Sequence, residues 1–130
     1  MNIYCVGHNY IDHIKELKNE IPENPIFFQK NSTCISKNKT IHLNKNHEIH
    51  YELELVLTIK SSLHFCHEEI VYNFISKYSL GLDLTNRKLQ NKNRKSGLPW
   101  FESKSFPNSA ILTNSRDFNL SEVNNDFWLK

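Results

Sequence analysis

The sequence has few glycines, no long apolar run and no strong charge of one sign. Three glycines among 130 residues leave little material for glycine-rich phosphate loops, so a Rossmann or P-loop nucleotide site is nearly excluded. No apolar run reaches the roughly 18 residues that a membrane-spanning helix needs. A formal net charge of +2 favours neither a nucleic-acid footprint nor a membrane surface. We therefore expect no nucleic acid and no membrane among the partners.

Cysteine is also scarce. Cys5, Cys34 and Cys66 are odd in number and show no paired spacing, which favours reduced thiols in a cytoplasmic protein and argues against structural zinc. The first residues lack the charged and apolar regions of a signal peptide. A length of 130 residues with 38% hydrophobic residues is typical of a single folded domain, which we expect to span residues 1–130.

Hydrophobic patterning predicts a mixed α and β chain in which strands dominate. Four segments have the pattern of strands: residues 3–6, 26–28 (a buried strand), 49–59 and 79–85. Two segments have the pattern of helices: residues 9–17 and 67–78. The other two polar segments are expected to be loops: residues 36–48, with a short strand at 41–43, and the basic stretch 87–95.

Three carboxylates on two predicted strands form the clearest candidate for a metal site. Glu52 and Glu54 are two residues apart, so their side chains project from one face with Cα atoms about 6.6 Å apart. Asp83 comes from the second strand, on the face opposite its leucines. Three carboxylates are hard oxygen ligands that suit Mg²⁺ or Mn²⁺. The alternative is that Glu52 and Glu54 form the solvated face of an amphipathic strand.

Three further residues are candidates for acid–base or electrostatic chemistry. His13 and Glu16 are three residues apart on the first predicted helix, so they could act as a general base and its orienting acid, or form an ordinary exposed pair. Lys104 lies close in sequence to Trp100 and Phe106. Its ammonium could stabilise an enolate or oxyanion, or its stem could simply pack on the aromatic rings.

Five segments, in order, resemble motifs of the fumarylacetoacetate hydrolase family. In this sequence they read CVGHNYIDHIKE (5–16), ENPIFFQKNST (23–33), HYELEL (50–55), LGLDLTNRKLQ (80–90) and KSGLPW with SKSF (95–106). The family patterns are CVGRNYxDHxxE, EEPxxFxKPST, HxExEL, GLDLTxRDxQ and KGLPWxxAKxF. Order and spacing hold from residue 3 to about residue 112, which makes the five motifs together far more specific than any one alone.

This resemblance implies a fold and a metal centre. The fold would be α+β, a mixed β-roll of the fumarylacetoacetate hydrolase type. Glu52, Glu54 and Asp83 would bind Mg²⁺ or Mn²⁺, and Lys104 would lie beside the metal.

The resemblance also implies a substrate and a reaction. Arg87 and Gln90 match positions near a bound small 2-oxo acid, and His13 and Glu16 match a catalytic pair on a mobile helix that closes over the substrate. The implied reaction is hydrolysis of an acylpyruvate, in which a C–C bond breaks through a metal-chelated enolate. The alternative is oxaloacetate tautomerisation or decarboxylation through the same enolate.

Three departures from the family pattern matter. His8 stands where the family has Arg, and Asn31 stands where it has Pro. The family also continues beyond the point corresponding to Lys130, through further strands and a TGTPxGVG loop. We therefore expect this sequence to be the truncated, N-terminal portion of one catalytic domain. Such a portion would act as a homodimer or with a separate C-terminal chain, or it would be an inactive remnant.

Overall fold

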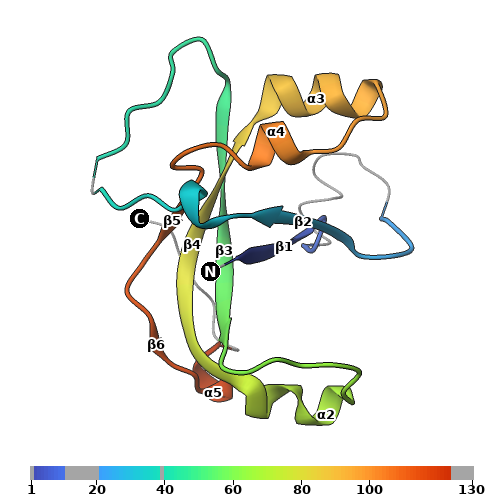
Figure 1. Ribbon diagram of the computed structural model, residues 1–130, viewed down its shortest axis with the longest axis vertical. Helices are drawn as coiled ribbons and strands as arrows, with labels where there is room; N and C mark the ends of the chain where they lie inside the picture. Colours follow the sequence, from blue (N-terminus) through green and yellow to red (C-terminus); the bar gives the residue numbers. More distant parts are fainter. Residues whose placement is uncertain (1, 11–20, 39, 124–130) are drawn as a thin grey trace. The chain divides into compact units, whose positions relative to one another are not determined.

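The computed structural model describes residues 2–10, 21–38 and 40–123. The chain forms two compact units, and Figure 1 traces its elements in sequence order. The first unit comprises Met1–His50 with Leu84–Ala110, and the second comprises Tyr51–Asp83 with Ile111–Lys130. Among the helices described, none combines the length and the apolar character needed to cross a membrane.

The first unit contains an antiparallel pair of strands, β1 (Ile3–Gly7) and β2 (Ile26–Lys30). Both predicted strands, 3–6 and 26–28, are confirmed. The expectation that the second is buried is wrong, because its side chains alternate and Phe27 is 68% exposed. The buried end of the strand is Lys30, at 1% exposure. Only one face of this two-stranded sheet is covered, so alternate residues face solvent.

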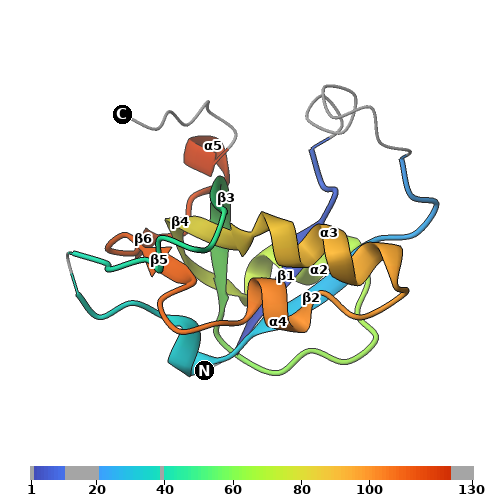
Figure 2. The same cartoon turned by 90° about the horizontal axis from the view of Figure 1, so that it is seen from above.

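Two helices complete the described part of this unit. A short 3-10 turn, η1 (Ser32–Cys34), follows β2, whereas α3 (Arg87–Lys95) and α4 (Phe101–Lys104) come from far along the chain. Helix α4 packs on β2 and on α3, as Figures 1 and 2 both show. The loop expected at 87–95 is therefore wrong. A side-chain cap at its start and three basic residues in its last turn, which complement the helix dipole, favour a helix there.

The longer sheet lies mostly in the second unit. Its strand order is β3 (Ile49–Ile59), β4 (Ile75–Asn86) and β5 (Ala110–Leu112), and the short β6 (Arg116–Asp117) also pairs with β4. The predicted strand 49–59 is confirmed, and the strand predicted at 79–85 is confirmed within the longer β4. The short strand expected at 41–43 is wrong, because those residues are irregular.

The helix predicted over 67–78 is largely wrong. Helix α2 (Glu68–Val71) and the 3-10 turn η2 (Tyr72–Phe74) occupy its first half, and β4 takes over at Ile75. Pairing with β3 decides this outcome: the N–H of Lys60 donates to the carbonyl of Phe74 at 2.9 Å. A helical face and a strand face are hard to separate in a short apolar run, so the neighbouring strand determines which one forms.

The second unit packs closely at Gly81 and leaves apolar residues exposed along β3. A Cβ atom on Gly81 would lie 2.9 Å from Cγ2 of Val56 and 3.2 Å from Cδ2 of Leu112, so glycine permits this contact. Along β3, which is an edge strand of the described sheet, Tyr51 is 64% exposed and Ile59 is 50% exposed. Exposed apolar edges of this kind are typical of surfaces that bind further polypeptide.

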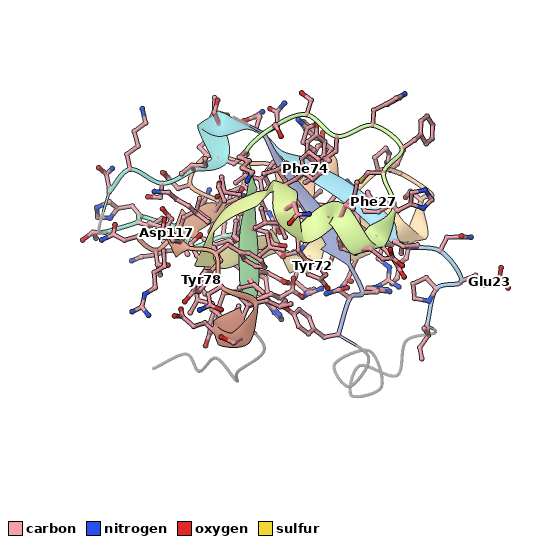
Figure 3. All side chains as sticks on the ribbon, turned by 90° about the horizontal axis from the view of Figure 1, so that it is seen from below. Glu23, Phe27, Tyr72, Phe74, Tyr78 and Asp117 are labelled. Carbon is pink, nitrogen blue, oxygen red and sulfur yellow. The ribbon has the colours of Figure 1, made fainter. Side chains whose placement is uncertain are left out.

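A buried tyrosine joins β4 to α5 (Leu120–Val123). The hydroxyl of Tyr78 donates to Oε2 of Glu122 at 2.6 Å, and Figure 3 shows Tyr78 beside α5. This hydrogen bond raises the pKa of Tyr78, burial raises it further, and Arg116 partly opposes the shift. The protonated tyrosine is therefore the form that the folded second unit favours.

The raised pKa of Tyr78 predicts a pH-dependent contribution to stability. The contribution is fully present below the unfolded value near 10 and is lost as the pH rises through the higher folded value. We expect Tyr78→Phe to lower the Tm at pH 8, and we expect the difference from the native chain to shrink or reverse above pH 10. Thermal melts across this range measure it. Tyr72→Phe, on an exposed ring stacked on Phe118, is the control, and identical pH curves for Tyr78→Phe and the native chain would contradict the prediction.

Candidate functional site

The three predicted metal ligands lie on neighbouring strands of the second unit. Glu52 and Glu54 are half-buried on β3, and Asp83 is buried near the end of β4. Half-burial of the two glutamates does not decide between a metal site and a partly solvated strand face, so both interpretations stay open. The strands that carry the three carboxylates are neighbours in the sheet.

As a donor set, these three carboxylates suit Mg²⁺ or Mn²⁺, because both ions prefer oxygen ligands. Within residues 2–10, 21–38 and 40–123, however, no three His, Cys, Asp or Glu side chains are gathered closely enough to hold a metal ion. The chemistry of the ligands fits a divalent metal, whereas the present side-chain positions do not close around one. Metal ligation by the three residues stays a prediction.

Helix α3 brings the two predicted substrate-binding residues together. Nη1 of Arg87 donates to Oε1 of Gln90 at 2.7 Å, one helical turn away. Oδ1 of Asn86 caps the helix by accepting from the N–H of Leu89 at 3.2 Å, and the N–H of Arg87 donates to the carbonyl of Glu48 at 2.8 Å. The cap and the backbone bond fix the first turn, so the guanidinium and the amide are presented as a pair.

Lys104 ends α4 and is almost fully buried, at 3% exposure. Its Nζ lies 4.9 Å from the centroid of the Phe28 ring, a cation–π distance. Helix α4 begins after Trp100, whose carbonyl accepts from the Ser103 hydroxyl at 2.7 Å. The aromatic ring that Lys104 meets is therefore Phe28 of β2, a residue that the sequence analysis did not pair with it. Lys104 belongs with Arg87 to the first unit.

The other two predicted catalytic residues cannot be placed. His13 and Glu16, with most of the predicted helix 9–17, lie outside the described residues. Their roles stay predictions.

Sequence reasoning missed one residue that the structure brings to the centre of the first unit. The Nζ of Lys30 donates to the carbonyls of Leu84 at 3.2 Å and Ser109 at 3.0 Å, and also to the carbonyl of Lys104. A usable signal existed, because Phe28 and Lys30 are two residues apart and share the covered face of β2.

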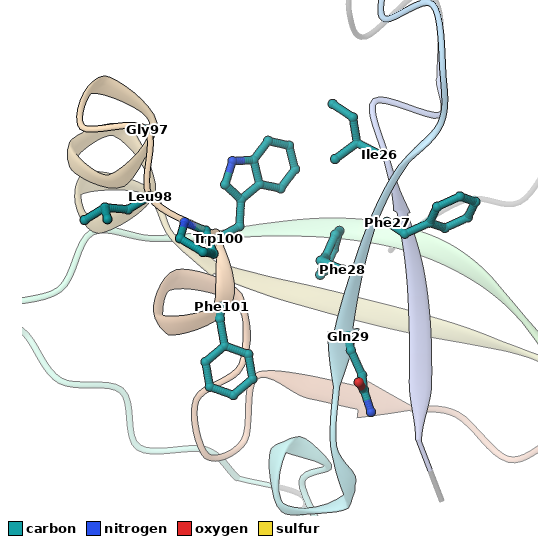
Figure 4. Close-up of a pocket in the computed structure, with 9 residues that line it drawn as sticks. Ile26, Phe27, Phe28, Gln29, Gly97, Leu98, Trp100 and Phe101 are labelled. Carbon is teal, nitrogen blue, oxygen red and sulfur yellow. The ribbon is translucent and has the colours of Figure 1, made fainter.

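A pocket of about 460 Å³ opens beside these residues, between residues 26–29 of β2 and residues 97–101. Figure 4 shows Phe28 directed toward Trp100, and their ring centroids are 6.1 Å apart. The His8 ring contacts the same indole at 5.7 Å, and a Cβ on Gly7 would lie 2.8 Å from Trp100. Glycine in β1 therefore allows the indole to approach. His8, which stands where the family motif has Arg, therefore contacts an aromatic ring in this chain.

Comparison with known proteins identifies the family. The family described as fumarylacetoacetate (FAA) hydrolase C-terminal matches residues 2–121. The chain therefore belongs to the fumarylacetoacetate hydrolase family, as its motifs predict. It is 38% identical over 113 residues to the oxaloacetate tautomerase of Escherichia coli, a match that covers 85% of this chain and 52% of that protein.

Solved structures show the same α+β fold. A candidate fumarylacetoacetate isomerase/hydrolase from Oleispira antarctica superposes with a TM-score of 0.85 at 37% identity, over 92% of this chain and 55% of that one. The fumarylpyruvate hydrolase of Pseudomonas aeruginosa, solved with Mn²⁺ and pyruvate, superposes with a TM-score of 0.82 at 30% identity. The match covers 95% of this chain and 55% of that one. The chain thus spans about half the length of the relatives it matches. Several relatives are named as mitochondrial, so the cytoplasmic compartment stays a prediction.

The helix cap that presents Arg87 and Gln90 can be tested directly. We expect Asn86→Ala to lower the free energy of unfolding by about 1 kcal/mol, because the Leu89 N–H loses its acceptor. Chemical denaturation measures the change. Asn86→Asp, which keeps an acceptor oxygen, should retain most of the stability, and Asn91→Ala, an exposed position on the same helix, should cost nothing. Equal losses for Asn86→Ala and Asn91→Ala would rule out the cap.

Proposed function

We propose that the protein is a divalent-metal-dependent enzyme that acts on small 2-oxo acids. The observation that carries this proposal is the family match over residues 2–121. That range contains every residue singled out above for catalysis, substrate binding and metal ligation: His13, Glu16, Glu52, Glu54, Asp83, Arg87, Gln90 and Lys104. The Mn²⁺ and pyruvate in the P. aeruginosa relative support both the class of metal and the class of substrate.

Two reactions are supported about equally by the relatives. Hydrolysis of an acylpyruvate is our first proposal, and the fumarylpyruvate hydrolase among the relatives favours it. Keto–enol tautomerisation of oxaloacetate is the second, and the E. coli relative carries that name. Both reactions place negative charge on the oxygen of an enolate, so a single set of stabilising groups serves either outcome.

The chain's own residues would divide the work of the hydrolysis. The guanidinium of Arg87, held by Gln90, is suited to a carboxylate, which accepts two parallel hydrogen bonds from it. The ammonium of Lys104 would stabilise negative charge that develops on the substrate oxygen. His13, oriented by Glu16, would take a proton from the water that attacks the acyl carbonyl, and would return a proton to the pyruvate carbon as the C–C bond breaks.

Glu52, Glu54 and Asp83 would hold Mg²⁺ or Mn²⁺. When bound, such an ion polarises carbonyl and carboxylate oxygens as a Lewis acid. Because the described side chains of the three carboxylates are not close enough together to hold an ion, the proposal requires them to converge when the ion binds.

The metal assignment predicts a specific pattern of loss. We expect Glu52→Gln and Asp83→Asn each to weaken Mn²⁺ binding at least about tenfold, since even outer residues of metal sites have effects of this size. Titration followed by the electron paramagnetic resonance of free Mn²⁺ measures affinity, and acetylpyruvate cleavage and oxaloacetate tautomerisation are assayed in parallel. Glu69→Gln, an exposed glutamate on α2, is the matched control. Unchanged Mn²⁺ affinity in both site variants would remove the trio from the proposal.

We also propose that the active assembly contains more polypeptide than this chain. The relatives are about twice as long, and Tyr51 and Ile59 expose apolar surface along the edge strand β3. A second copy of the chain or a separate C-terminal chain could cover that edge.

Sedimentation velocity on the purified 130-residue chain distinguishes these cases. We expect either a dimer, or a poorly folded monomer that gains a cooperative melt when a C-terminal chain is co-expressed. Ile59→Lys should weaken either association, because it places a charge on the apolar edge, whereas Lys60→Glu, at the next exposed position, should not. A soluble monomer with an ordinary cooperative melt and full activity would contradict the requirement for a partner.

A further inference from the structure

Lys30 contacts the backbone of Lys104 while no role has been assigned to it. We propose that Lys30 is a positioning residue, whose buried ammonium fixes the direction in which Lys104 presents its side chain. The inference rests on the proposed function, because it concerns the residue assigned there to stabilise negative charge. All contacts that carry it lie within the first unit.

The ammonium of Lys30 is surrounded by oxygen atoms from three separate segments. Four oxygens lie within hydrogen-bond distance of its three hydrogens: the carbonyl of Leu84 on β4, the carbonyl of Lys104 on α4, and both the carbonyl and the hydroxyl of Ser109 at 3.0 Å. The Phe106 ring lies on another side, with its centroid at 5.8 Å. A lysine ammonium has three rotatable donors and can serve acceptors that are not coplanar, which a planar guanidinium cannot.

The bonds around Lys30 close into a network that leaves the Lys104 carbonyl little freedom. The Ser109 hydroxyl donates to this carbonyl at 2.9 Å, and the N–H of Leu84 donates to the Ser109 carbonyl at 2.9 Å. A buried charge is tolerated only when its donors are satisfied, so the acceptors cannot move apart without a large cost. Each acceptor therefore holds the others in place.

Lys104 depends on this network because its own helix is short. Helix α4 has four residues, and the carbonyl of Lys104 is among those that a helix end leaves without an intrahelical donor. Strand β2 supplies the hydrogen-bond donor that the helix lacks. Lys30 bonds the backbone carbonyl of Lys104, and Phe28, two residues earlier on the same face, contacts its Nζ at 4.9 Å.

Chemical acylation of lysines, read out by peptide mass spectrometry, tests the inference without any need for activity. In the native chain Lys104, at 3% exposure, should react slowly, and the exposed Lys92 serves as the reference in the same digest. We expect Lys30→Met, which keeps the volume and removes the charge, to raise the rate at Lys104 by about tenfold through local opening. Lys88→Met is the control and should leave the rate at Lys104 unchanged.

A second variant keeps the test decisive if Lys30→Met does not fold. Ser109→Ala removes one acceptor of Lys30 and one donor to the Lys104 carbonyl, and it should raise the rate at Lys104 in the same direction but less. The inference fails if Lys104 reacts at the native rate in every variant that melts cooperatively. This outcome is independent of whether the chain binds Mn²⁺ or turns over a substrate.

In the active assembly, a double-mutant cycle separates positioning from a merely structural role. If Lys30 acts through Lys104, Lys30→Met lowers kcat with little change in KM, and it has no further effect on kcat when Lys104 is already Met. Multiplicative losses in the double variant would show that Lys30 acts independently of Lys104. Absence of activity in the native assembly would count against the proposed function and would leave the acylation result standing.

Discussion

The first unit is organised around one buried cation. Lys30 lies at the end of β2, and its ammonium is met by backbone oxygens of Leu84, Lys104 and Ser109. Apolar contacts could bring these segments together in many arrangements, because they are not directional. A buried ammonium accepts only arrangements that satisfy its donors. The position of the segment that contains Lys104 is therefore determined by the buried charge of Lys30. The aromatic ring of Phe28 covers the side chain of Lys104 but is not directional in the same way.

The described part of the second unit is held by different means. Its strands meet across Gly81, where Val56 and Leu112 approach too closely for a side chain, and Tyr78 bonds Glu122 at the far end of β4. Apolar residues remain exposed along β3. A sheet of this kind gains stability when further surface is buried against it. Its exposed edge and the greater length of the relatives are independent observations that support the same proposal of additional polypeptide.

A strand could be predicted from the sequence where its own hydrophobic pattern was sufficient and pairing with a neighbouring strand was not needed to decide the outcome. Residues 49–59 alternate between apolar and polar side chains except at Val56, and the structure forms a strand with those limits. Residues 67–78 could satisfy a helix or a strand, and pairing with β3 placed Ile75 and the residues after it in β4. The basic stretch 87–95 suggested a solvated loop by its charge, whereas the local cap at Asn86 favoured a helix. Local capping outweighed composition in that case.

The same distinction applies to the candidate site. Arg87 and Gln90 are three residues apart, so once α3 forms they meet by helix geometry alone. The spacing of Lys30 from Phe28 places it on the covered face of β2, but the oxygens that bond it come from positions 54, 74 and 79 residues away and could not be identified from the sequence. The family motifs predicted which residues belong to the site, and only the three-dimensional contacts revealed how Lys104 is held.

The basic and the acidic residues of the candidate site differ in the interactions that hold their side chains in place. Arg87 and Lys104 are oriented by the protein itself, through Gln90, Phe28 and the backbone bonds of α4. Glu52, Glu54 and Asp83 are like charges, and Coulomb repulsion opposes their approach unless a cation lies between them. In metal centres the ion supplies that attraction, and ligand convergence is part of the binding free energy. The groups proposed to bind substrate are thus oriented by folding, whereas the carboxylates proposed to bind a metal would have a physical reason to gather when the ion binds.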